Sequence, residues 1–384
     1  MNLEFWTVII RLVFIILFPY LDEEYNSWIK IRDINFWIII LVIILFLIIL
    51  RVGTSIKIRI NFLFIILFYS ILVRNFIRFF LIYEIVFILI IFRIIFLGYR
   101  FERLIASFLI LFYSFLFSSP TLIILIIFDY RFLLKSWLNY SYLINYFLII
   151  SFIVKFPIFG FHYWLPVAHV EASTIGSMVL AGILLKLGGL GLFYVISFMK
   201  FIMKFHWLAI AVPLLIIIIL WISDLKIIIA YSSVAHITIV FYVMIIGSFV
   251  GKKGALIIIF YHGVISPLIF WVVGILAWWK TRSLIVVKFL VFSSVFIFIL
   301  FFLLIINIGF PPFLGFLREV FILKAVWLYK LVFFIIVISV LFRCYYNIYL
   351  FWCFNNCSGI IFKVNIFMLD IFVFILLSLI LAIY

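Results

Sequence analysis

Long apolar runs, separated by short polar breaks, extend over almost the whole chain. A helix needs about 20 predominantly apolar residues to cross a bilayer, and most of the runs approach or exceed that length. Because lipid offers no partner to exposed backbone groups, such runs predict transmembrane helices. About thirteen runs can be counted: 5–20, 35–51, 58–74, 76–97, 104–128, 141–165, 172–198, 206–222, 225–247, 254–278, 287–328, 329–352 and 364–383. The divisions at 74–76 and 328–329 are the weakest.

Prolines interrupt two of these runs. Pro157 lies inside 141–165, and Pro311-Pro312 lies inside 287–328, where it frees the carbonyl group of Asn307 from the helix ladder. Irregular backbone at membrane depth is tolerated only beside protein or a water-filled cavity, and interrupted helices form ion sites in transporters. The pattern therefore predicts an all-α polytopic bundle of about 13–14 helices, two of them interrupted.

Composition supports a membrane protein and excludes most soluble functions. Apolar residues make up 71% of the chain, charged residues only 10%, and the mean hydropathy is +1.55. No polar stretch is long enough for a soluble catalytic domain. The net charge of +16 comes partly from short loops such as 252–253 and 280–282. Loops of this kind indicate anchoring to anionic lipid head groups rather than nucleic-acid binding.

Four ionisable residues lie where the apolar runs predict lipid depth. They are Lys155, Lys186, Glu84 and Glu319. A charge at the bilayer centre costs roughly 2.5–3.5 kcal/mol, so such residues usually face a polar interior and carry ions or protons. We therefore predict a proton relay in which Glu84 pairs with Lys155, Lys186 carries the proton onward, and Glu319 is the last group.

Simpler interpretations of these four residues stay open at this point. A lysine near a helix end can extend its ammonium group to the membrane surface. Glu84 could form a structural ion pair with an arginine such as Arg93, and Glu319 could be a surface acid at a helix end. Its neighbour Arg318 is expected to point to a different side of the helix.

Four of the five histidines also fall in or near apolar runs. They are His162, His169, His236 and His262. A buried histidine is commonly just hydrogen-bonded, but four of them beside intramembrane lysines and acids favour a supporting role in the relay. His162, His169 and Glu171 do not have a metal-ligand spacing, and the three cysteines form no CxxC pair, so we predict neither metal site nor disulfide. The Gly-Leu-Gly at 189–191 lacks a dinucleotide fingerprint and predicts close helix packing.

The motifs around the lysines resemble a known family. Residues 154–172 (VKFPIFGFHYWLPVAHVEA) and 176–189 (GSMVLAGILLKLGG) closely resemble the chain 4 family of mitochondrial NADH:ubiquinone oxidoreductase, respiratory complex I. Three further segments resemble it too: 224–240 (DLKIIIAYSSVAHITIV), 261–270 (YHGVISPLIF) and 307–322 (NIGFPPFLGFLREVFI). The resemblance covers roughly 76–350.

The resemblance implies an antiporter-like, proton-translocating subunit in the mitochondrial inner membrane. The family's principal membrane charges fall on Glu84, Lys155, Lys186 and Glu319. It implies no cofactor in this chain, since NAD, FMN, iron–sulfur clusters and ubiquinone are bound by other subunits. The implied partners are other membrane-arm subunits, above all the other antiporter-like chains, and anionic lipids. It also implies N-terminal helices over 1–75, a translocating core over 76–352 and a C-terminal helix over 353–384.

Some positions depart from the family pattern. Arg318 and Ser173 stand where the family has glycine and proline, and about thirteen runs replace about fourteen helices. Two other functions remain as alternatives: a subunit of a stand-alone sodium/proton antiporter, and a purely structural membrane subunit. Co-migration with NADH dehydrogenase activity would distinguish the first of these from a complex I subunit.

Overall fold

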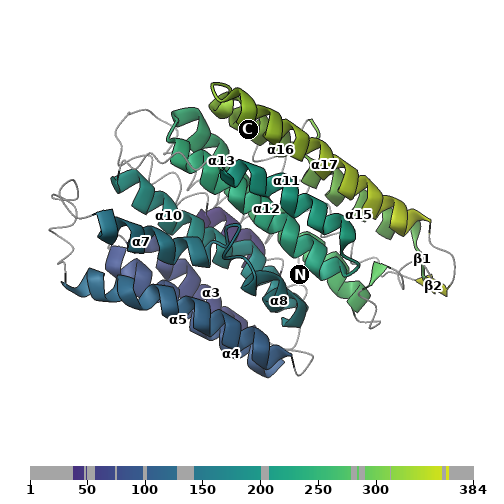
Figure 1. Ribbon diagram of the computed structural model, residues 1–384. Coiled ribbons are helices and arrows are strands. Elements are labelled where there is room, and N and C mark those ends of the chain that lie inside the picture. Colours follow the sequence, from purple (N-terminus) through teal and green to yellow (C-terminus); the bar gives the residue numbers. More distant parts are fainter. Residues whose placement is uncertain are drawn as a thin grey trace, which may run out of the picture.

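The computed structural model is a layered bundle of helices (Figure 1). It describes residues 38–46, 49, 57–73, 76–97, 102–127, 142–199, 207–277, 283–284, 290–311, 313–356 and 360–362. The first half of the bundle contains α3 (Lys57–Leu72), α4 (Phe76–Leu97), α5 (Arg103–Ile127), α7 (Tyr142–Lys155), α8 (Trp164–Glu171), α9 (Thr174–Val179), the π-helical turn η2 (Leu180–Leu184) and α10 (Leu185–Met199). The second half contains α11 (Trp207–Trp221), α12 (Leu225–Ile246), α13 (Phe249–Ala277), α15 (Ser294–Ile308), α16 (Leu314–Val326) and α17 (Lys330–Asn355).

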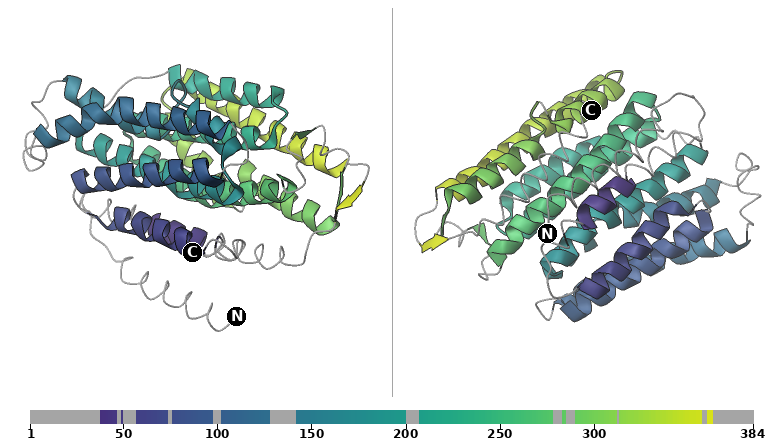
Figure 2. Two further views of the ribbon diagram at one scale, coloured as in Figure 1. Left: turned by 90° about the horizontal axis from the view of Figure 1, so that it is seen from below. Right: turned by 180° about the vertical axis from the view of Figure 1, so that it is seen from behind.

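The central helices are almost completely enclosed by the others. Six stretches among the described residues are long and apolar enough to cross a membrane. Within an 18-residue apolar window of each stretch, the buried share is 100% for Thr174–Ile196 and 89% for Leu225–Ile246, but only 22% for Arg103–Ile126 and 33% for Lys330–Asn355. Figures 1 and 2 agree with this order, since α4 and α5 form one edge, α15 and α17 the opposite edge, and α10, α12 and α13 lie between. Lys186, His236 and His262 lie on these inner helices.

The apolar runs predicted these helices well. The described helices match the predicted runs between 58 and 352, and both weak divisions are present, because α3 ends at Leu72 and α16 ends at Val326. Predicted runs 5–20 and 364–383 lie outside the described residues, as does most of the predicted N-terminal unit and of the C-terminal helix. The all-α class is confirmed. The one addition is a parallel pair of three-residue strands, β1 (Leu290–Phe292) and β2 (Ile360–Phe362), in which Val291 pairs with Ile361.

Both predicted helix interruptions are present. The first separates α7 from α8 and contains Pro157 and Gly160, whose positive φ of 102° suits only a residue without a Cβ atom. The second separates α15 from α16, and there Gly309 ends α15 in a left-handed conformation with φ 92°. Each irregular segment is only partly enclosed, since Phe156 and Ile158 are buried whereas Tyr163 and Phe310 are each 60% exposed.

Glycines allow the inner helices to approach closely. A Cβ atom at Gly189 would lie 3.0 Å from Cε2 of Phe156, and the ring of Phe152 occupies the space beside Gly191. These contacts join α10 to α7 and to the segment that follows it. The prediction that Gly-Leu-Gly serves close packing is confirmed.

Candidate functional site

Glu84 and Lys155 form an ion pair inside the bundle. Glu84 lies in the middle of α4, and Lys155 is the last residue of α7, directly before the first interruption. The Nζ atom of Lys155 donates a hydrogen bond to Oε1 of Glu84, and the two side chains are only 1% and 16% exposed. Lys155 therefore does not extend to the surface of the chain, and the partner of Glu84 is a lysine rather than Arg93.

Aromatic rings enclose the ammonium group of Lys155. Its Nζ atom lies 4.3 Å from the ring centroid of Phe80, 5.0 Å from that of Tyr83 and 5.9 Å from that of Phe87. All three rings come from the α4 face that carries Glu84. A desolvated cation over ring faces gains electrostatic attraction, so α4 supplies both the charged partner and the π faces.

Lys186 lies just after a π-helical turn that the apolar pattern did not predict. The turn η2 spans Leu180–Leu184, and the amide of Leu185 donates to the carbonyl oxygen of Leu180, five residues earlier. The Nζ atom of Lys186 donates to the carbonyl oxygen of Ala181 at 2.5 Å, and the residue is 2% exposed. Single π-helical turns are frequent at functional sites. The turn provides a backbone acceptor for a buried ammonium group in place of a carboxylate.

Three of the four histidines lie in the interior close to these charges. The rings of His236 on α12 and His262 on α13 are 4.9 Å apart, and His169 on α8 stacks on Phe270 at 4.5 Å. Both ring nitrogens of His169 and of His262 are buried without a hydrogen-bond partner among the described residues. Buried polar atoms of this kind call for water.

The histidine pair links Lys186 to the second interruption. α13, which carries His262, packs against the π-helical turn before Lys186 and against α16 after the second interruption. His162 is different. It lies in the irregular segment before α8, is only partly buried, stacks on Phe159 at 5.4 Å and accepts a hydrogen bond from the amide of Gly160 at 3.2 Å. The structure thus brings three of the predicted histidines to the interior and leaves His162 near its boundary.

Glu319 lies between two arginines. Its Oε1 atom is 3.0 Å from Nη1 of Arg343 on α17 and 3.8 Å from Nη2 of Arg318. The expectation that Arg318 points to another side of the helix is wrong, because the long side chain bends back within ion-pair range. Glu319 is 14% exposed, which disfavours the alternative interpretation of a surface acid. Sequence analysis missed Arg343, because nothing in the 329–352 run indicates that it pairs with Glu319.

Arg318 also contacts the interrupted helix and an aromatic ring. Its Nη2 atom donates to the carbonyl oxygen of Asn307 at 3.0 Å, the carbonyl group that Pro311-Pro312 was predicted to free. The guanidinium carbon lies 4.7 Å from the ring centroid of Tyr261, and Arg318 is 0% exposed. Its Nε and Nη1 atoms have no hydrogen-bond partner among the described residues.

Sequence analysis missed one further buried lysine. Lys226 on α12 is not among the predicted site residues, yet it is 2% exposed. Its Nζ atom donates to the carbonyl oxygens of Ala172 at 2.9 Å and Val170 at 3.3 Å. It therefore closes the C-terminal end of α8, where a cation suits the helix dipole. Asp224 is the first flanking residue of α12, but its side chain makes no capping hydrogen bond.

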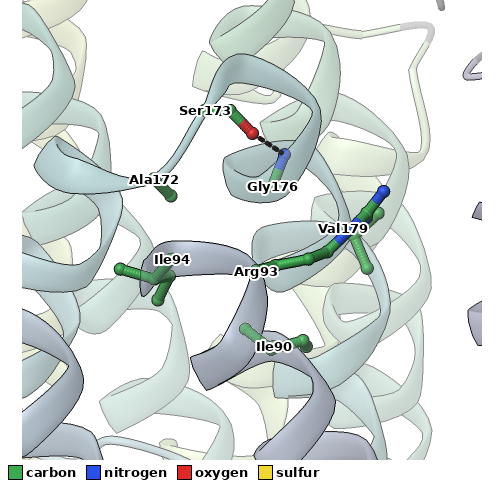
Figure 3. Close-up of a pocket in the computed structure, with 7 residues that line it drawn as sticks. All are labelled: Ile90, Arg93, Ile94, Ala172, Ser173, Gly176 and Val179. Carbon is green, nitrogen blue, oxygen red and sulfur yellow. Dashed lines mark hydrogen bonds between the residues drawn. The ribbon is translucent and has the colours of Figure 1, made fainter. Parts of the chain in front are cut away.

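A small pocket lies where α4 meets the α8–α9 corner. Its lining includes Arg93, Ala172, Ser173 and Gly176, and Figure 3 shows the Arg93 side chain beside Val179. The hydroxyl oxygen of Ser173 accepts a hydrogen bond from the amide of Gly176 at 3.2 Å, which caps α9 in place of the proline expected from the family pattern. Among the described residues, no group of three or more histidine, cysteine or acidic residues could hold a metal ion.

A known protein family matches most of the chain. The family described as NADH:quinone oxidoreductase/Mrp antiporter, TM matches residues 73–343. This range includes Glu84, Lys155, Lys186, Glu319 and Arg343. The chain belongs to this family.

Curated relatives of the chain carry one name. NADH-ubiquinone oxidoreductase chain 4 from Aedes aegypti is 38% identical over 247 residues, covering 60% of this chain and 55% of that protein. The relative of that name from Ceratitis capitata is 36% identical, covering 66% and 60% of the two chains. The chain thus spans less than two thirds of these relatives. It covers 68% of the Locusta migratoria protein at 34% identity, so the predicted resemblance to chain 4 is confirmed.

Solved structures of two kinds share the fold. A chain of respiratory complex I from Thermus thermophilus aligns over 91% of this chain and 80% of its own length, with a TM-score of 0.77 and 19% identity. A chain of the Mrp complex from Dietzia aligns over 86% of this chain and 66% of its own length, with a TM-score of 0.72 and 12% identity. At these identities the likeness shows the shared fold alone.

Proposed function

We propose that this chain is a proton-translocating membrane-arm subunit of NADH:ubiquinone oxidoreductase. The observation that supports it most is the series of buried ionisable groups across the bundle. The series starts at the Glu84–Lys155 pair and continues through Lys186 and the two central histidines to Glu319. A bundle with a purely structural role gains nothing from so many buried ionisable groups arranged in series, because burying each one costs free energy. The names of the curated relatives supply the complex to which the relay would belong.

The proposed mechanism begins at the ion pair. Electron transfer elsewhere in the complex changes the position of Glu84 relative to Lys155. When the carboxylate moves away, the ammonium group loses its partner and releases a proton toward Lys186. When it returns, Lys155 takes up another proton. One pKa unit corresponds to about 1.4 kcal/mol, so a small movement of a buried charge is enough to drive the exchange.

The histidines would carry the proton through the second half of the bundle. His236 and His262 are near enough to exchange a proton through one water molecule, and His262 has free ring nitrogens among the described contacts. His169 lies at the α8 side of Lys186. His162 lies near the boundary of the interior, where it serves proton entry. Glu319 receives the proton last, and its arginines restore the carboxylate after release.

The remaining assignments follow from the same proposal. NAD, FMN, iron–sulfur clusters and ubiquinone are bound by other subunits, and this chain contributes to the NADH:ubiquinone reductase reaction only through proton movement. Its neighbours are other membrane-arm subunits, including the antiporter-like chains, and anionic lipids at its basic loops. Its location is the mitochondrial inner membrane.

Lys186→Met tests the relay directly. The complex is purified, reconstituted in liposomes, and assayed for protons moved per electron as well as for NADH:quinone turnover. We expect assembled complex with fewer protons per electron. Lys253→Met is the matched control, because that lysine is exposed at the start of α13. Normal stoichiometry in Lys186→Met would refute the relay.

A stand-alone antiporter remains the second candidate, because the fold is shared with the Mrp complex. It predicts cation/proton exchange in vesicles without NADH or quinone. A native gel separates the two, since a complex I subunit must migrate with NADH dehydrogenase activity. Migration of the chain only in a smaller assembly without that activity would favour the antiporter.

A further inference from the structure

Tyr83 is in contact with the surroundings of both buried lysines. It precedes Glu84 on α4 and is 0% exposed. Its ring centroid lies 5.0 Å from Nζ of Lys155, and its hydroxyl group donates a hydrogen bond to the carbonyl oxygen of Leu184 at 3.2 Å. Leu184 is the last residue of the π-helical turn, two residues before Lys186. One side chain therefore reaches from the ion pair to the backbone that positions the second lysine.

The π-helical turn is held by side chains on two of its carbonyl groups. The ammonium group of Lys186 binds the carbonyl oxygen of Ala181, and the hydroxyl group of Tyr83 binds that of Leu184. Helical turns of this width are less favourable than α-helical turns and depend on their surroundings. Loss of the Tyr83 contact would therefore favour a rearrangement of this turn. The rearrangement would change the direction in which Lys186 points.

The packing fixes the direction of the Tyr83 hydroxyl group. The ring is nearly parallel to those of Phe79 and Phe152, at 6.1 and 6.5 Å, and meets Phe87 edge-on at 5.2 Å. Opposite the hydroxyl group lies Gly188, where a Cβ atom would stand 2.8 Å from the phenol oxygen. The glycine leaves space for the oxygen, and three rings prevent the phenol from turning elsewhere.

We propose that Tyr83 is a positioning residue that couples the Glu84–Lys155 ion pair to Lys186. Neighbours on one helix move together, so a shift of α4 that separates Glu84 from Lys155 also pulls the Tyr83 hydroxyl group from Leu184. The π-helical turn then rearranges and redirects Lys186 toward its next partner. Tyr83 keeps its own proton throughout. This inference rests on the proposed function, since it describes how the first step of the relay is linked to the next.

Tyr83→Phe is the decisive variant, because it removes one oxygen atom and keeps every ring contact. A neutral hydrogen bond is worth about 0.5–1.5 kcal/mol, so the balance between the two states of the turn should shift by a factor of about 2 to 13. In the reconstituted complex we expect normal assembly and NADH:quinone turnover with about half the protons per electron or fewer. Tyr69→Phe is the control, because that tyrosine on α3 is 55% exposed.

Gly188→Ala disrupts the same contact from α10, the helix opposite Tyr83. Its methyl group displaces the hydroxyl group, so we expect the same loss of stoichiometry with turnover retained. In the double variant Tyr83→Phe/Gly188→Ala the 2.8 Å contact is absent, and the methyl group meets only Cβ of Phe156 at 3.3 Å and the carbonyl oxygen of Lys155 at 3.4 Å. The loss should therefore be clearly smaller than the sum of the two single losses. Additive losses, or normal stoichiometry in Tyr83→Phe, would overturn the coupling role.

Lys186→Met in the same assay separates this inference from the proposed function. If Lys186→Met abolishes proton movement while Tyr83→Phe pumps normally, the relay stands and the role of Tyr83 is wrong. If Lys186→Met also pumps normally, the relay itself is wrong and the inference falls with it. General loss of packing would lower turnover and stoichiometry together, which the split between the two measurements detects.

Discussion

At the scale of single residues, each buried charge has its own kind of partner. Lys155 faces a carboxylate and three rings, Lys186 and Lys226 bind backbone carbonyl groups, and Glu319 faces two arginines. A charge paired with a carboxylate can be controlled by moving that carboxylate, whereas a charge on a carbonyl group is held by helix geometry. These differences define what a substitution will do.

Glu84→Gln should leave the Lys155 ammonium group buried without its anionic partner. Breaking a buried ion pair from one side costs about 3–5 kcal/mol. We expect a lower midpoint of thermal inactivation of the assembled complex, together with loss of proton movement. The control Glu102→Gln changes an exposed acid at the start of α5 and should alter neither.

The double variant Glu84→Gln/Lys155→Met distinguishes stability from function. With both charges removed, the thermal midpoint should return most of the way to its original value while proton movement stays lost. Recovery of proton movement in the double variant would contradict the relay and favour a structural pair.

Arg318→Gly restores the residue type of the family pattern. It should lower the stability of the complex and leave proton pumping unchanged. It removes the hydrogen bond to Asn307, the stacking on Tyr261 and helix propensity in α16, for a loss of about 1–3 kcal/mol. Proton stoichiometry should persist, because Arg343 stays 3.0 Å from Glu319. The midpoint of thermal inactivation and the number of protons moved per electron are measured on one preparation. A lower number of protons at an unchanged midpoint would contradict this prediction.

At the scale of elements, the two interruptions place irregular backbone beside the charges. At the first, the indole N–H group of Trp164 donates to the carbonyl oxygen of Val154 at 3.0 Å, next to Lys155. At the second, Arg318 takes the same role for Asn307. In each case the side chain that satisfies the freed carbonyl group comes from the helix after the interruption, so the two half-helices are fixed relative to each other.

Trp164→Phe removes the donor at the first interruption and keeps most of the buried ring. A buried carbonyl group without its partner costs about 1–3 kcal/mol. Hydrogen exchange of the amides between 155 and 163 should accelerate, as measured by mass spectrometry of the intact complex. Trp221→Phe, at a residue that is 87% exposed, should leave that segment unchanged, and equal protection in both variants would contradict the anchoring role.

At the scale of the whole molecule, the bundle is apolar outside and also in most of its interior, where a few ionisable side chains are buried among apolar ones. Large apolar side chains on α5 and α17 face outward, among them Phe115 at 74% exposure and Phe334 at 70%. The ionisable side chains, among them Lys186, His236 and Arg318, are buried instead. An apolar outer surface matches a lipid solvent, and the two outer edges offer surfaces to lipid or to neighbouring subunits.

Phe115→Lys should reduce the amount of assembled complex, because it places an ammonium group on the outward face near the middle of α5. The cost at membrane depth is roughly 2.5–3.5 kcal/mol. Leu328→Lys is the matched control, since Leu328 is 86% exposed in the turn between α16 and α17, where a lysine can reach water. Quantification on native gels gives the comparison, and equal assembly of both variants would contradict a lipid-depth position for Phe115.

The sequence by itself determined the class of the protein, the positions of most described helices and both interruptions. These features depend on local properties of the sequence, namely the length and apolarity of each run and the positions of the prolines. It also identified Glu84, Lys155, Lys186 and Glu319, because a charge inside an apolar run is conspicuous wherever the chain folds.

Only the tertiary structure decided which groups meet. Lys155 and Glu84 are 71 positions apart, and Arg343 reaches Glu319 across 24 positions. The π-helical turn, the burial of Lys226 and the bond from Tyr83 to Leu184 arise because helices distant in sequence pack side by side. No local pattern encodes such contacts, since they depend on the rotation and depth of each helix against its neighbours.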